Sequence, residues 1–291
     1  MDWLKYRVAY FGLSVVLVGI SVYSLVSWGL PLGIDFKGGS ILEYSSEKNF
    51  STEEAVSKAG EAGIEVESVQ VVGEKNYLFR LGQVGSEERE KLREVLRKLV
   101  DGEVEEVQFQ NVGPLIGPEL VKKTIYALLI SAGAILTWVA YQFKSVRFGV
   151  CAILAMLHDS FVLVGLFSLL GHFFGAEIDY LFVTALLTTL SFSVHDTIVV
   201  YDRIREIRKK KGGKVSEVAN KALSETMRRS INNSVTIILM LLALATLGGT
   251  SVRWFALALL LGTALGTYSS PFVAVPLLVS WDESVKRFRK T

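Results

Sequence analysis

Residues 191–206 read SFSVHDTIVVYDRIRE, an apolar run that contains the carboxylate Asp196 and continues directly into a basic segment. Placing a charged side chain in the hydrocarbon core of a bilayer costs roughly 2.5 to 3.5 kcal/mol on insertion scales. A chain that keeps such a residue usually has a use for it. Asp196 is therefore the first candidate functional residue.

The rest of the chain is also strongly apolar: 51% of its 291 residues are hydrophobic. A helix needs about 20 apolar residues, each rising about 1.5 Å, to cross roughly 30 Å of hydrocarbon. Six blocks reach that length, at residues 8–28, 124–143, 148–171, 178–201, 231–248 and 254–280. The sequence therefore predicts a membrane α-helical bundle of six transmembrane helices.

The charges predict the orientation of these spans. Residues 29–120 contain 18 acidic and 10 basic residues, whereas residues 201–230 contain 10 basic and 4 acidic residues. Because cytoplasmic loops carry an excess of Lys and Arg, the basic loop 201–230 is expected inside and the acidic segment outside. Both termini then lie in the cytoplasm. Only Arg253, in a short loop expected outside, departs from this pattern.

The acidic segment has the pattern of a small soluble domain. It is expected to form strand 41–45, helix 51–60, strands 66–72 and 76–81, helix 86–100 and strand 104–110. The order βαββαβ is that of a ferredoxin-like α+β fold, a four-stranded antiparallel sheet with two helices on one face. Three parts follow: 1–28 with the first span, an extracytoplasmic ferredoxin-like domain at 29–120, and 121–291 with the remaining spans.

Two glycine-containing segments border this domain. After the first span, Gly33, Gly38 and Gly39 flank a short turn that is expected to need positive φ angles. Before the second span, residues 111–120 (NVGPLIGPEL) contain Pro114 and Pro118 and are expected to form a stiff connector.

Span four carries a polar stripe. Thr189, Ser193 and Asp196 are spaced so that they share one face of a helix. Hydrocarbon offers no hydrogen-bond partner, so this face is expected to pack against other helices.

Residues 215–229 have an amphipathic pattern and are expected to form a helix at the inner interface. That helix ends near Arg229, which is positioned to reach Asp196.

Spans three and four contain three further ionisable residues. His158 and Asp159 lie near the middle of span three. Two roles are equally open for this pair: they could relay protons, or they could hold spans three and four together by packing. His195 is expected to be a hydrogen-bonded core histidine. For Asp196, the alternative to a functional role is that of a hydrogen-bonded carboxylate that only supports the structure. In span six, Gly262 and Gly266 favour close helix contact, and two prolines favour a kink.

Other classes of site have little support. The single cysteine lies inside a predicted span, so the chain has no disulfide framework and no Cys/His cluster for a metal. The soluble domain contains neither His nor Cys. These patterns indicate no enzyme, no cofactor and no nucleic-acid partner.

Five motifs, in this order, resemble the SecF proteins of the SecD/SecF protein-export family, within the wider RND transporter superfamily. They are GIDFKGGS (33–40), VGPLIG (112–117), LHD (157–159), HDTIVVYDRIRE (195–206) and LSETMRRSINNS (223–234). The resemblance implies a subunit in a prokaryotic cytoplasmic (inner) membrane that works with SecD beside the SecYEG channel. It would use the proton motive force to help export unfolded polypeptides.

The resemblance also assigns roles to two residues. In the family, the carboxylate before TIVV and an arginine at the start of the next span are tied to proton movement, which corresponds to Asp196 and Arg229. The family commonly has Asn before the carboxylate, whereas this chain has His195. An imidazole with an ordinary pKa of about 6.5 could titrate beside Asp196.

Three other classes fit parts of the pattern. An RND-type transporter subunit for a lipid or small molecule would require two copies of this six-span chain. An intramembrane aspartyl protease would use Asp159 and Asp196, but neither lies in a GxGD motif. A passive receptor or scaffold would have no use for the polar stripe in span four.

Overall fold

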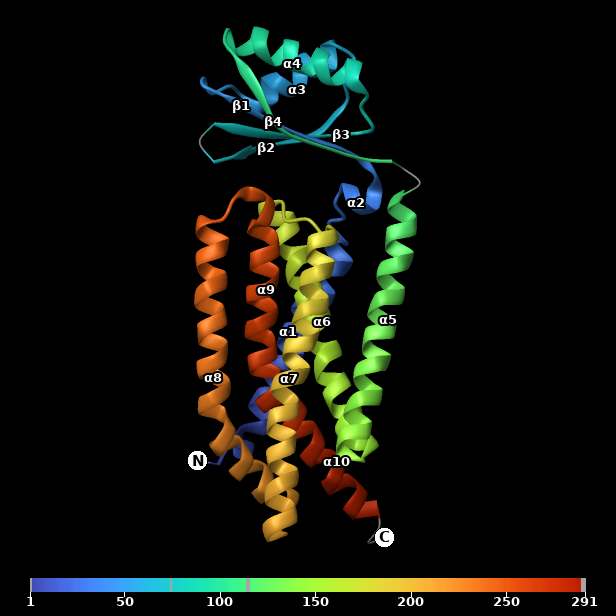
Figure 1. Cartoon of the computed structure of the whole chain (residues 1–291), viewed down its shortest axis with the longest axis vertical. Coiled ribbons are helices and arrows are strands. Elements are labelled where there is room, and N and C mark those ends of the chain that lie inside the picture. The colour runs from blue at the N-terminus through green and yellow to red at the C-terminus, as the bar shows by residue number, and fades with distance from the viewer. Residues whose placement is uncertain (1, 74, 114–115, 289–291) are drawn as a thin grey trace. The chain divides into compact units, whose positions relative to one another are not determined.

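The structure is a computed structural model that describes residues 2–73, 75–113 and 116–288 (Figure 1). Its contacts divide the chain into two units. One combines Met1–Pro31 with Tyr126–Thr291, and the other is Leu32–Ile125.

The first unit is a helical bundle. Among the described residues, six helices are long and apolar enough to cross a membrane, which confirms the predicted number of spans. A 3-10 turn, Trp3–Tyr6, precedes the first of them. The helices are α1 (Arg7–Trp28), α5 (Ile116–Phe143), α6 (Val146–Phe174), α7 (Tyr180–Lys211), α8 (Val215–Leu247) and the interrupted pair α9 (Thr250–Ser269) and α10 (Val275–Phe288).

Helix α9 packs against α6, α7 and α8, and small residues allow its close contact with α7. A methyl group on Gly266 would lie 3.1 Å from the Cβ of Ser193, and one on Gly262 would overlap the side chain of Thr189. This confirms the close packing expected of the two glycines. It also brings the polar stripe of α7 against α9.

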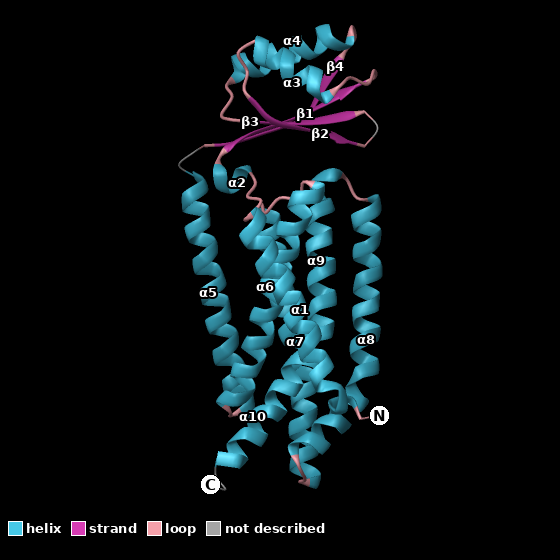
Figure 2. Ribbon diagram, turned by 180° about the vertical axis from the view of Figure 1, so that it is seen from behind, coloured by secondary structure: helices cyan, strands magenta, loops and turns pink. Residues whose placement is uncertain are grey.

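Span six is interrupted where the prolines predict a kink. A π-helical turn, Ser270–Ala274, separates α9 from α10, and the two helices run in different directions in Figures 1 and 2. Pro271 lies in this turn. Proline removes one backbone donor and clashes with the preceding turn, which accounts for the interruption.

The prediction of a separate amphipathic helix at residues 215–229 is wrong. The segment is the first part of the continuous helix α8. Its apolar face is buried in the main core of the bundle, through Val215, Val218, Ala219, Ala222 and Leu223. Because these side chains pack on other parts of this chain, they do not need a bilayer interface.

The second unit contains a four-stranded antiparallel sheet with strand order β2-β3-β1-β4. The strands are β1 (Gly39–Ser46), β2 (Val66–Val72), β3 (Asn76–Leu81) and β4 (Val104–Val112). Helices α3 (Thr52–Glu61) and α4 (Ser86–Val100) cover the same face of this sheet (Figure 2). In register, Leu42 of β1 lies opposite Phe79 of β3 and Phe109 of β4.

The core of this unit lies between the sheet and the two helices. Leu42, Tyr44, Phe79, Leu92 and Leu96 are fully buried there. Burial raises the pKa of the Tyr44 phenol well above its ordinary value. The unit has no disulfide to support it, since Cys151 is a free thiol of the other unit. Its stability therefore depends on this core.

Phe79→Ala is expected to lower the free energy of unfolding of this unit by about 3 to 5 kcal/mol, because it leaves a cavity under both helices. The matched control is Phe109→Ala, since Phe109 lies in the neighbouring part of the sheet but is 36% exposed. Its cost should stay near 1 kcal/mol or below. Limited proteolysis of the full chain in urea would measure the difference. Equal losses would contradict the placement of the core.

The segment after the first span forms one helical turn, α2 (Ile34–Lys37), before β1. Gly38 and Gly39 have φ angles of 80° and 123°, as predicted, but Gly33 has a φ of −75°, so the expectation for it is wrong. A Cβ on Gly39 would lie 2.8 Å from the carbonyl oxygen of Leu81. Glycine is thus required there by both conformation and space.

Candidate functional site

Asp196 lies in the buried face of α7. The residue is only 5% exposed, and its carboxylate accepts a hydrogen bond from the hydroxyl of Ser230 in α8. Thr189 and Ser193 are buried on the same helix, as the polar stripe predicts. Among the described residues, no ion pair involves Asp196. A carboxylate in a membrane-spanning helix therefore depends on a single hydroxyl for direct support.

Asp159 in α6 forms a more extensive junction. Its Oδ2 accepts hydrogen bonds from Ser193 of α7 at 2.7 Å and from Ser269 of α9 at 2.5 Å. Its Oδ1 lies 3.0 Å from Nδ1 of the adjacent His158. Asp159 thereby connects three membrane-spanning helices. The Nε2 of His158 is buried without a hydrogen-bond partner in the part of the chain that the structure describes.

A small network of hydroxyl groups surrounds Ser193 of α7, which also donates to Asp159. The carbonyl oxygen of Ser193 accepts bonds from Thr197 at 3.0 Å and from Ser270 at 3.1 Å. The hydroxyls of Thr197 and Ser270 are 2.9 Å apart. Ser270 begins the π-helical turn of span six, and such turns often occur at functional sites. Among the described residues, Thr189 bonds only to the carbonyl of Leu186 in its own helix.

The two remaining candidates lie on the surface of the bundle. Arg229 precedes Ser230 in α8 and is exposed, and it forms no ion pair with Asp196. It is nevertheless close enough to Asp196, as is His195, to interact with it electrostatically. His195 is exposed rather than buried, so the expectation of a core histidine is wrong. Its two neighbours in the chain, Val194 and Asp196, are both buried.

Sequence reasoning missed the hydroxyl donors of this site. Ser230, Ser269 and Ser270 come from spans five and six, for which the sequence indicated a starting arginine and helix packing only. Serines next to Arg229 and before Pro271 are a weak signal, because Ser also occurs in membrane helices for packing. Their role depends on which helix lies opposite, and this only the fold decides.

The two buried carboxylates have separate surroundings. Among the described residues, no group of three or more His, Cys, Asp or Glu side chains could hold a metal ion. Asp159 and Asp196 accept hydrogen bonds from different hydroxyls. A buried carboxylate can instead exchange a proton when a cation or water approaches it.

Two family models match the chain. The model of the protein export membrane protein SecD/SecF C-terminal region matches residues 91–284, and that of the SecD/SecF GG motif matches residues 23–49. The first alone covers more than half of the chain. The GG motif includes Gly38 and Gly39, the two glycines with positive φ.

Relatives extend this match to the whole chain. The protein translocase subunit SecF of Thermobaculum terrenum is 42% identical and matches 100% of this chain and 98% of the relative. The protein translocase subunit SecF of Anaerolinea thermophila is 38% identical over 97% of this chain and 94% of its own length. The protein translocase subunit SecDF of Bacillus subtilis is 30% identical, but this chain spans only 38% of it.

A solved structure agrees with these relatives. The crystal structure of SecDF from Thermus thermophilus, described as a translocon-associated membrane protein, superimposes with a TM-score of 0.86 at 32% identity. The match covers 97% of this chain and 39% of the SecDF chain. The family model and the Thermus structure are described as membrane proteins, and the two SecF relatives are named as translocase subunits. The chain, a multi-pass membrane protein, therefore belongs to the SecF proteins of the SecD/SecF protein-export family.

Proposed function

We propose that the chain is an accessory subunit of the Sec protein translocase that couples the proton motive force to the export of unfolded proteins. One observation carries the coupling: Asp196 is buried in a membrane-spanning helix, and a single hydroxyl supports it, with Arg229 nearby. The membership in the SecF family supports the role in export.

In this mechanism Asp196 is the group that changes charge. Asp159 accepts bonds from two hydroxyls and lies beside His158, so we assign it to packing between helices. Asp196 has fewer fixed partners and responds to the position of Arg229. An approaching guanidinium stabilises the carboxylate and releases the proton, whereas withdrawal of the guanidinium favours the protonated form. Movement of α8 relative to α7 would alternate these states.

The energy of one proton limits this cycle. A charge crossing the membrane yields about 2.3 kcal/mol per 100 mV, and each pH unit adds about 1.4 kcal/mol. Changing a two-state equilibrium from 1:99 to 99:1 needs about 5.5 kcal/mol. One proton at 100 mV and one pH unit therefore falls short. A complete change of state requires a larger gradient or more than one proton per cycle.

The second unit would be the moving part outside the membrane. Its element order and strand order support a ferredoxin-like domain, and its acidic composition supports an extracytoplasmic location with both chain termini in the cytoplasm. The proposed domain limits remain 1–28, 29–120 and 121–291. The connector that would transmit motion is shorter than the predicted 111–120, because β4 extends to Val112 and α5 begins at Ile116, and its Pro114 lies outside the described residues.

Partners follow from the relatives. In Bacillus subtilis a SecF-like sequence is part of a longer SecDF chain, which supports SecD as the partner of this chain. We extend the proposal to the SecYEG channel and to the exported polypeptide, because the Thermus structure is of a translocon-associated protein. A proton-driven transporter of lipids or small molecules is the competing assignment.

Reporter export in inverted membrane vesicles tests the proposal. Vesicles that contain SecYEG and SecD, with or without this chain, receive ATP and a reporter protein, and the proton gradient is applied or collapsed. We expect the gradient to accelerate late export at least severalfold only when the chain is present. Equal export with and without the chain, at equal channel levels, would refute the role in export.

A further inference from the structure

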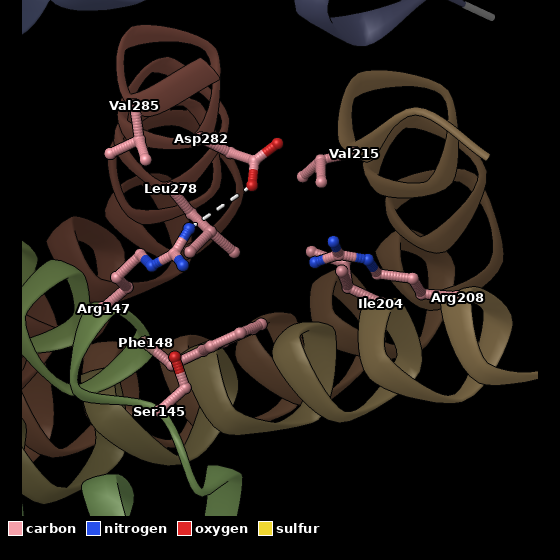
Figure 3. A pocket seen from close by; sticks show the side chains of 9 residues that line it. All are labelled: Ser145, Arg147, Phe148, Ile204, Arg208, Val215, Leu278, Asp282 and Val285. Atoms are coloured by element: carbon pink, nitrogen blue, oxygen red, sulfur yellow. Dashed lines mark hydrogen bonds and ion pairs between the residues drawn. The ribbon is translucent and has the colours of Figure 1, made fainter. Parts of the chain in front are cut away.

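A cavity of about 300 Å³ lies in the helical bundle between the start of α6, the last turns of α7, the start of α8 and α10 (Figure 3). It is separate from the two buried carboxylates. Its polar lining includes Ser145, Arg147, Arg208 and Asp282. Cavities of this size hold small ligands or parts of larger ones.

The charges of the cavity favour an anion. Arg147 pairs with Asp282 at 3.4 Å. Arg208 extends into the cavity from α7 in Figure 3 and makes no side-chain hydrogen bond or ion pair with any described residue. Ser145 is the N-cap residue of α6 and brings the positive end of that helix dipole to the same place. One guanidinium thus remains available for an anionic ligand.

Arg208 also lines a second, more open cavity of about 460 Å³. Lys144, Arg205 and Lys209 line that cavity, and none of the described residues that line it is acidic. Arg205, Arg208 and Lys209 lie on one face of α7 because they are three and four positions apart. Arg205 donates to the carbonyl oxygen of Gln142 at 2.7 Å, which fixes this end of α7 to the end of α5. The basic groups are therefore held together by the fold.

The other walls of the first cavity are apolar. Phe148, Ile204, Val215, Leu278 and Val285 line it. Arg147 directly precedes the apolar run that begins at Phe148, so the cavity lies where a membrane span meets the headgroup layer. A free inorganic anion has no use for apolar walls, whereas a phospholipid presents both a phosphate and hydrocarbon there.

We infer that this cavity binds the phosphate headgroup of an anionic phospholipid, with Arg208 as its main contact and Arg147 as its second. Guanidinium groups bind phosphate through two parallel hydrogen bonds. Anionic lipids are also drawn to clustered basic residues at the membrane surface. A zwitterionic lipid carries a cation that the same arginines repel. The ligand class is therefore a phosphatidylglycerol-like lipid.

The test is lipid binding to the purified full-length chain in detergent. Native mass spectrometry and thermal shift would be recorded with dioleoylphosphatidylglycerol, dioleoylphosphatidylcholine and inorganic phosphate. We expect one retained phosphatidylglycerol at concentrations at which neither phosphatidylcholine nor inorganic phosphate binds. Arg208→Gln is expected to weaken phosphatidylglycerol binding about tenfold, the usual scale for losing a charge-assisted hydrogen bond.

Two further variants decide the interpretation. Lys210→Gln removes the same charge from the same helix, but Lys210 pairs with Glu206 and lines neither cavity, so it should change binding less than twofold. Asp282→Asn removes the negative charge from the cavity and should strengthen binding, which damage to the fold would not do. Equal weakening by Arg208→Gln and Lys210→Gln would overturn the proposal in favour of diffuse surface attraction. Equal binding of inorganic phosphate would overturn the assignment to a lipid.

Discussion

Asp196→Asn is expected to abolish the acceleration of late protein export by a proton gradient while leaving ATP-driven export in place. Asparagine has nearly the shape of aspartate, and its carbonyl oxygen can still accept the hydrogen bond from Ser230. It cannot bind or release a proton at any accessible pH. The variant therefore removes the proposed chemistry and keeps the packing of α7 against α8.

The vesicle assay measures this effect as the ratio of export rates with and without the gradient. In the parent this ratio should be severalfold, and in Asp196→Asn it should fall to about one. Glu217→Gln is the matched control, because it neutralises an exposed carboxylate in the first turn of α8. Its ratio should equal that of the parent. A gradient response that persists in Asp196→Asn, at equal insertion, would make Asp196 a structural residue.

Asp159→Ala is expected to destabilise the helical bundle by about 2 to 4 kcal/mol. The substitution leaves the hydroxyls of Ser193 and Ser269 without their acceptor at the junction of α6, α7 and α9. Each lost hydrogen bond to a charged group costs about 1.5 to 3 kcal/mol in soluble proteins, and bonds between membrane helices cost less. Unfolding of the purified chain in mixed micelles with increasing SDS would measure the change.

Asp159→Asn separates the two roles that the sequence left open for this residue. The carbonyl oxygen of asparagine can accept the bonds from Ser193 and Ser269, so stability should fall by about 1 kcal/mol or less. Because we assign Asp159 to packing, this variant should retain the gradient response. A folded Asp159→Asn protein without that response would identify Asp159 and His158 as a second proton site.

Local patterns determined most of the secondary structure. The residues of β2, β3 and α4 agree with the predicted ranges, because alternation and amphipathic spacing are properties of the strand or helix itself. The six spans follow from the length of their apolar runs. The polar stripe of α7 is buried as its helical spacing predicts. Each of these features depends on neighbours along the chain.

Contacts between helices decided the rest. Val215 and its apolar neighbours pack on the bundle instead of lying at a membrane interface, although an amphipathic pattern fits both places. His195 is exposed although both of its chain neighbours, Val194 and Asp196, are buried, because no other helix of the described chain covers its position on α7. A hydrophobic or polar face specifies that a partner is needed. It does not specify which partner.

The sequence by itself thus determined the family and the number of spans, since these depend on composition and on motifs read in order, and it singled out Asp196 as the candidate that we propose to carry the proton. Only the tertiary structure decided that Ser230 supports Asp196, that Ser193 and Ser269 hold Asp159, and that Arg208 lines two cavities. Hydrogen bonds and cavities form between residues that are distant in the chain. Their partners are fixed by the packing of one helix on another, which no local period of the sequence encodes.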